Sequence, residues 1–191
     1  MKTTKSRLFA ALAVGMMLCV ANSAFALETP QISPTRSSAG IFGGLSFVGN
    51  SNGTKVGIGA DANHRFDEVW GFGFYFDYIS LGSTIASVNG VPFTLSTNIV
   101  HVMLEGNYYF PGAFEGLHAG LKIGPAFTSG SNNGANIAVY SGTDVAYGLT
   151  AAYDINIGHD FTAGPELNVL QSTQNNGPTI VNAVAVLKLF F

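Results

Sequence analysis

The C-terminal stretch Ala183-Val184-Ala185-Val186-Leu187-Lys188-Leu189-Phe190-Phe191 has the alternation of a β-strand and ends the chain on an aromatic residue. Successive side chains of a strand point to opposite faces. One face therefore carries Ala183, Ala185, Leu187, Leu189 and Phe191, and the other carries Val184, Lys188 and Phe190. The last residues of a soluble protein usually fray, so a hydrophobic terminal strand is unusual there. A strand that closes a barrel against lipid accounts for the pattern.

The opposite end of the chain predicts export. Basic residues occur within positions 1–7, an uncharged apolar run extends from Leu8 to Val20, and Ala24-Phe25-Ala26 has the form of a cleavage site. This order is typical of a secretory signal peptide, so we expect residues 1–26 to be removed. An uncleaved membrane helix is the alternative. Cys19 is the only cysteine and would leave with the signal, so we expect no disulfide in the mature chain.

The composition favours a membrane barrel over other classes. Three of the eight basic residues lie in the expected signal, so five face eleven acidic residues after cleavage and the formal charge becomes −6. Without a basic patch, nucleic acid is not an expected partner. Only 10% of the residues are charged and 47% are hydrophobic, yet no apolar run of about 18 residues follows the signal. A closed β-barrel can be hydrophobic and poor in charge without a long apolar run, because only alternate residues of each strand face lipid.

Alternating segments recur along the chain. The clearest sets Trp70, Phe72, Phe74, Phe76 and Tyr78 against Gly71, Gly73, Tyr75, Asp77 and Ile79. Eight such segments lie at about residues 41–48, 55–63, 70–79, 100–109, 117–128, 144–157, 161–169 and 183–191, the first too mixed for its faces to be assigned. Short connections (65–69, 111–116, 158–160) alternate with longer ones (50–53, 82–96, 130–142, 173–178). We predict an all-β, eight-stranded antiparallel up-and-down transmembrane barrel over residues 40–191, after a polar lead-in at 27–39.

Ionisable side chains fall on the face of the strands that points into the barrel. The candidate lumenal charge network consists of Asp77, His101, Glu105, Lys122, Glu166 and Lys188. Simple hairpin registers place Glu105 opposite Lys122, Asp77 opposite His101, and Lys188 diagonal to Glu166. Charges in so narrow an interior are usually paired, which predicts a structural network. The alternative interpretation is a salt-bridge gate over a small pore.

The strand number, the loop asymmetry and the terminal Phe191 resemble the small eight-stranded outer-membrane β-barrels, typified by the OmpA transmembrane domain and OmpX. The resemblance covers about residues 40–191 and is architectural. It implies a Gram-negative outer-membrane location and contact with outer-membrane lipids, including lipopolysaccharide. It also implies insertion by the barrel-assembly machinery, with Phe191 as part of the assembly signal. It implies no single activity, because that group has many functions.

We therefore expect a structural or surface-interaction role through extracellular loops, around Ser87–Pro92 and Ser131–Tyr140. A narrow channel or carrier for small solutes or apolar molecules is the alternative, and a lipid-modifying enzyme is a third possibility. We expect no enzyme, because no histidine has a serine partner and a lipid-facing position. The four histidines are scattered, so no metal or cofactor site is expected. A soluble lipocalin-like barrel is the rival fold.

Overall fold

The computed structural model describes residues 36–49, 54–88, 91–111, 116–133, 141–173 and 178–191. These residues belong to one compact unit that ends at Phe191. The expected signal peptide, residues 1–26, lies outside the described residues, as do most of the expected loop around Ser131–Tyr140 and the connection at 50–53. No helix of the described residues is long and apolar enough to span a membrane.

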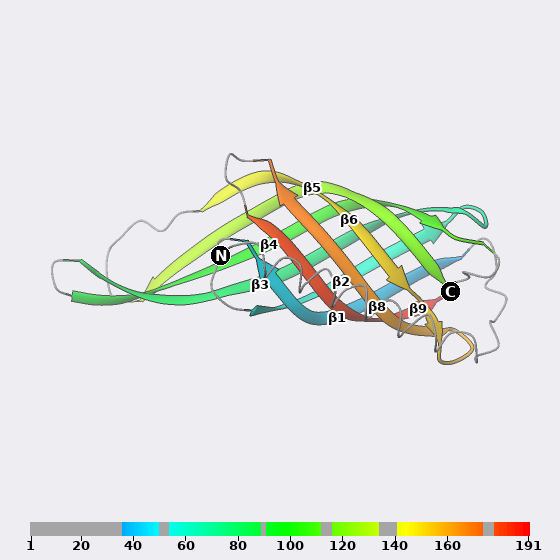
Figure 1. Cartoon of the computed structure of the whole chain (residues 1–191), viewed down its shortest axis with the longest axis horizontal. Helices are drawn as coiled ribbons and strands as arrows, with labels where there is room; N and C mark the ends of the chain where they lie inside the picture. Colours follow the sequence, from blue (N-terminus) through cyan, green and yellow to red (C-terminus); the bar gives the residue numbers. More distant parts are fainter. Residues whose placement is uncertain (1–35, 50–53, 89–90, 112–115, 134–140, 174–177) are drawn as a thin grey trace, which may run out of the picture. The chain divides into compact units, whose positions relative to one another are not determined.

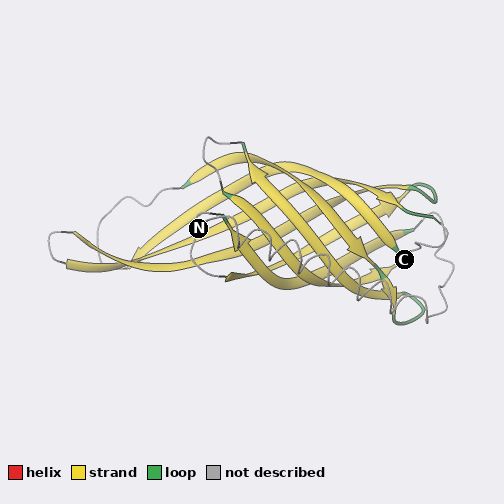
Figure 2. Cartoon of the chain, viewed as in Figure 1, coloured by secondary structure: helices red, strands yellow, loops and turns green. Residues whose placement is uncertain are grey.

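The chain folds into a closed, antiparallel β-barrel (Figures 1 and 2). The strands are β1 (Ser37–Val48), β2 (Thr54–Arg65), β3 (Trp70–Val88), β4 (Val91–Tyr109), β5 (Leu117–Asn133), β6 (Gly142–Tyr153), β7 (Ile155–Asn156), β8 (Phe161–Ser172) and β9 (Thr179–Phe190). Apart from β6 and β7, each strand pairs with its neighbour in the sequence, and β1 pairs with β9 to close the barrel. Because β6 and β7 both pair with β8 and are separated only by Asp154, they form one strand of the barrel. The predicted eight-stranded fold is therefore confirmed, with β1 beginning three residues before position 40.

Side chains alternate between a buried interior and an exposed outer surface. On β3, Tyr75 is 1% exposed, whereas Phe74 is 58% exposed. The same alternation assigns the inner and outer faces of β1, which the sequence pattern alone does not assign. Phe42 and Ser46 point inward, while Ile41 and Leu45 are exposed on the outside. A soluble barrel would bury these apolar groups, so the lipocalin-like alternative does not describe this fold.

Both ends of the barrel segment lie at the end with the short connections. Ser37 N–H donates a hydrogen bond to Phe191 O at 3.2 Å, and Phe191 N–H donates to Ser37 O at 2.9 Å. At the same end, the turn between β2 and β3 is held by Asp67, which accepts hydrogen bonds from the N–H groups of Trp70 and Val69, each at 2.7 Å. These bonds favour the ionised carboxylate and lower the pKa of Asp67.

The expected loop at residues 82–96 is wrong, because most of this segment is a β-hairpin. β3 and β4 are 19 residues long, and their pairing continues to Val88 opposite Val91. In Figure 1 these two green strands extend beyond the other strands. The register shifts between Ser80 and Gly82, and Gly82 adopts a φ of 88°, which only glycine tolerates readily. The Gly/Ser/Thr composition suggested a loop, but the β-branched residues of this segment favour strands.

Candidate functional site

The centre of the lumen is organised around Lys122, which β5 directs inward. Its Nζ lies 3.1 Å from Glu166 Oε1 and 3.5 Å from Glu105 Oε1, and it donates a hydrogen bond to Asn168 Oδ1 at 2.6 Å. The ammonium also lies 3.6 Å from the centre of the Tyr75 ring, in cation–π geometry. The side chain of Lys122 has no solvent exposure. One cation thus compensates two buried carboxylates contributed by β4 and β8.

A second cluster joins β3, β4 and β9. His101 lies opposite Asp77 in the β3–β4 register, and His101 Nδ1 is 2.6 Å from Asp77 Oδ1. The other carboxylate oxygen of Asp77 accepts hydrogen bonds from Tyr75 Oη at 2.9 Å and from Asn182 Nδ2 at 3.1 Å. Asp77 and His101 are 1% and 3% exposed. The carboxylate is therefore fully engaged inside the barrel and does not face lipid.

Lys188 belongs to a third cluster, and its expected diagonal contact with Glu166 is wrong. In the β8–β9 register Lys188 lies opposite Thr162, which is four residues from Glu166. Lys188 Nζ instead lies 3.1 Å from Asp154 Oδ1, and it is 3.5 Å from His118 Nε2. The last hairpin is longer than the tight turn that the prediction assumed, and the offset moves Lys188 toward the end of the barrel with the short turns.

The three clusters place each predicted network residue in the interior, and Tyr75 links the first two because its ring contacts Lys122 and its hydroxyl donates to Asp77. Lys122 contacts both Glu105 and Glu166, Asp77 contacts His101, and Lys188 contacts neither set. Sequence reasoning missed the partners Asn168, Tyr75 and Asp154. Each of them is inward-facing in the period-two pattern, but their contacts cross the lumen rather than join neighbouring strands.

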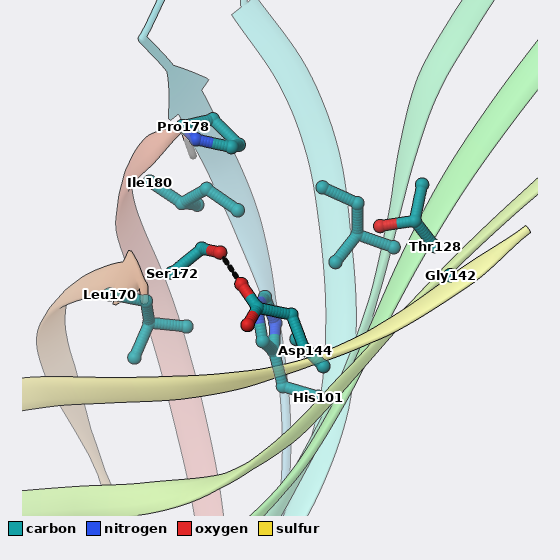
Figure 3. Close-up of a pocket in the computed structure, with 10 residues that line it drawn as sticks. His101, Thr128, Gly142, Asp144, Leu170, Ser172, Pro178 and Ile180 are labelled. Atoms are coloured by element: carbon teal, nitrogen blue, oxygen red, sulfur yellow. Dashed lines mark hydrogen bonds between the residues drawn. The ribbon is translucent and has the colours of Figure 1, made fainter. Parts of the chain in front are cut away.

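A small cavity of about 60 Å³ lies where β4, β5, β6, β8 and β9 approach the end opposite the termini (Figure 3). Its lining includes the apolar side chains of Ile99, Leu170 and Ile180 and the polar side chains of His101 and Asp144. Asp144 accepts hydrogen bonds from the hydroxyl of Ser172, from Thr173 Oγ1 at 2.8 Å and from Val145 N–H at 2.8 Å. These donors satisfy the carboxylate within the protein.

The charged groups of the lumen are enclosed within the barrel. A lipid-modifying site needs a nucleophile or base that faces lipid, whereas the His101–Asp77 pair is enclosed in the interior. Within the described parts of the chain, no three His, Cys, Asp or Glu side chains are grouped closely enough to hold a metal ion. Charged groups in each cluster are paired and hydrogen-bonded, as burial in a narrow interior requires.

Comparison with known proteins identifies the architecture. No protein-family model and no curated protein matches the chain. Ail, the attachment invasion locus protein of Yersinia pestis, superposes with a TM-score of 0.61 at 13% identity, over 83% of this chain and 100% of Ail. The chain has the fold of the small outer-membrane β-barrels.

Two other barrels support the same conclusion. Neisserial surface protein A gives a TM-score of 0.57 at 8% identity, over 83% of this chain and 98% of that protein. A major outer membrane protein from Thermus thermophilus gives 0.55 at 12% identity, over 81% of this chain and 99% of that protein. At such identities the likeness concerns the fold of the barrel alone.

Proposed function

We propose that the chain is an integral outer-membrane protein that interacts with other molecules through its extracellular side. The apolar outer surface of the strands supports insertion into lipid, with outer-membrane lipids, including lipopolysaccharide, as its surroundings. The polar and charged side chains point into the interior of the barrel, which leaves the apolar side chains to face lipid. The chain ends lie with the short connections, which face the periplasm in barrels of this type, so the opposite end faces outward.

The observation that carries the interaction role is the length of the strands at the outward end. β3 and β4 have 19 residues and β5 has 17, whereas β1, β2, β8 and β9 have 12 each. The extra residues continue past the barrel as a three-stranded sheet, since β4 pairs with β5 as far as Thr94 opposite Asn133. Ile85, near the tip of this extension, is 78% exposed. A barrel that served only as a membrane anchor would not need strands that continue past it and expose an apolar side chain such as Ile85.

The charge of the extension indicates the chemistry of its partner. No ionisable residue occurs between Tyr78 and Val100, or between Ile123 and Thr143, apart from the phenol of Tyr140. Ail has been crystallised with a heparin analogue, sucrose octasulfate. A sulfated ligand requires lysine or arginine, and the outward half of this barrel carries only Lys55 at its rim. The extension therefore favours an uncharged protein surface over a polyanion.

The location and orientation are tested by labelling single cysteines in intact Gram-negative cells with a membrane-impermeant maleimide. Ile85→Cys should react in intact cells. Phe66→Cys, in the turn between β2 and β3 and 55% exposed, is the matched control and should react only after the outer membrane is permeabilised. Labelling of Phe66→Cys in intact cells, or protection of Ile85→Cys, would contradict the proposed orientation.

A further inference from the structure

The extension has an open β-sheet edge. β2 pairs with β3 only as far as Val56 opposite Ser80, so beyond Gly82 the described part of the chain gives β3 a partner on one side only, which is β4. Exposed edges are usually protected by lysine, proline or a covering segment. Residues 82–88 contain neither lysine nor proline, and the side chains of Ser83, Ile85 and Ser87 are exposed. The edge is therefore a template for a further strand.

Pro92 determines which backbone groups this edge presents. Pro92 lies opposite Ser87 and has no N–H group, so this pair occupies a non-hydrogen-bonded position of the β3–β4 ladder. Because such positions recur every second residue, the pairs Ile85–Thr94 and Ser83–Ser96 are of the same kind. In a non-hydrogen-bonded pair the N–H and C=O groups point away from the partner strand. Residues 83, 85 and 87 therefore direct their N–H and C=O groups toward the open edge.

The edge is complementary to itself. The sequence Ser83-Thr84-Ile85-Ala86-Ser87 has serine two residues before and two residues after its central isoleucine. A two-fold axis at Ile85 would bring Ile85 against Ile85 of the second copy and Ser83 against its Ser87. All of these are positions whose backbone groups point outward, so about six inter-copy hydrogen bonds can form. We propose that β3 edges of two copies pair antiparallel about Ile85, joining barrels in two facing membranes.

The direction of the strand selects the facing arrangement. β3 runs outward from the short-turn end, so a strand antiparallel to it belongs to a barrel that points the opposite way. The absence of ionisable groups in residues 82–97 means that the two edges meet without like-charge repulsion, although each mature barrel has an expected net charge of −6. A single edge contact is small, so one pair is weak. Many copies on two membranes strengthen it by multivalency.

This inference rests on the proposed outward orientation, and disulfide cross-linking between cell populations tests it. In a Cys19→Ala background the Ile85→Cys chain should form a dimer with itself, because directly paired residues have Cα atoms about 5.5 Å apart. Ser83→Cys and Ser87→Cys are matched controls, since like residues would be offset by about 13 Å along the strand direction. Neither should cross-link when expressed alone, but mixing the two populations should yield a dimer at least tenfold above either.

The outcomes separate this inference from the proposed function. Dimers are detected on a non-reducing gel after mild oxidation. A dimer that forms in a mixture of Ser83→Cys and Ser87→Cys cells, and is lost when the cells are diluted, supports antiparallel pairing between facing membranes. Self-dimers of Ser83→Cys as abundant as those of Ile85→Cys would overturn the antiparallel register. Dimer only when both variants are expressed in one cell would overturn the facing arrangement. Maleimide access to Ile85→Cys without any dimer would overturn self-pairing alone, whereas no access would overturn the orientation itself.

Discussion

Replacement of Lys122 by methionine tests whether the lumenal charges hold the barrel together. Methionine nearly preserves the volume but removes the cation that lies 3.1 Å from Glu166 and 3.5 Å from Glu105. At an effective dielectric constant of about 20, each contact corresponds to roughly 5 kcal/mol of attraction. Desolvation of the buried ammonium offsets several kcal/mol of this. We expect Lys122→Met to lower the free energy of unfolding by about 3–5 kcal/mol, the usual loss when a buried ion pair is broken.

Urea titration of the refolded barrel in lipid vesicles measures this loss. The single tryptophan, Trp70, is exposed on the outer surface and reports folding by fluorescence, and the heat-modifiable shift on gels gives an independent measure. Adding Glu105→Gln and Glu166→Gln to Lys122→Met removes the uncompensated charges and should restore most of the stability. Lys55→Met, at the outward end of β2, is the matched control and should change stability by less than about 0.5 kcal/mol. A loss below about 1 kcal/mol for Lys122→Met would refute a stabilising role.

Two further predictions concern the membrane. Leu149 is 58% exposed on the outer face of β6, so Leu149→Arg should lower the free energy of unfolding in vesicles by about 2–4 kcal/mol, measured by the same titration. Thr150→Ser, on the inner face of the same strand, is the comparison. An unchanged stability of the Leu149→Arg barrel would contradict the lipid-facing assignment. Phe191 is the predicted assembly signal. Its deletion should reduce the yield of folded barrel in cells far more than refolding in detergent, both followed by heat-modifiable migration, and equal effects would show that Phe191 matters for packing alone.

The alternation of side chains was sufficient to predict the fold, because a barrel in lipid imposes a period of two on every strand. Turn length predicted some contacts between neighbouring strands, since the register places Glu105 opposite Lys122 as expected. It failed for the last hairpin, where Lys188 lies opposite Thr162. Contacts across the lumen were not predictable in this way. The approach of Lys122 to Glu166 joins β5 to β8 across β6, and it depends on the curvature of the closed sheet and on the reach of the lysine side chain. The network is therefore a property of the closed barrel.

The outward hairpin escaped prediction for a different reason. Sequence patterns distinguish strands from loops through apolar alternation, and that signal depends on one face meeting an apolar environment. Beyond Gly82 the exposed side chains of β3 include Ser83 and Ser87, and the backbone pairing with β4 continues. A loop and a solvated hairpin then have similar compositions. The bulge between Ser80 and Gly82 lies just past the point where the pairing of β3 with β2 ends at Ser80.

The distribution of charge separates the two parts of this molecule by role. The buried lysines, Lys122 and Lys188, have carboxylate partners inside the barrel, where strong pairing offsets desolvation. The extension has no such charges, so its contacts must rely on backbone hydrogen bonds and on apolar side chains such as Ile85. An uncharged open edge is a hazard for any protein that has no partner for it. The open edge of β3 is therefore the part of the molecule suited to contact a partner, whereas the lumenal charges contact one another inside the barrel.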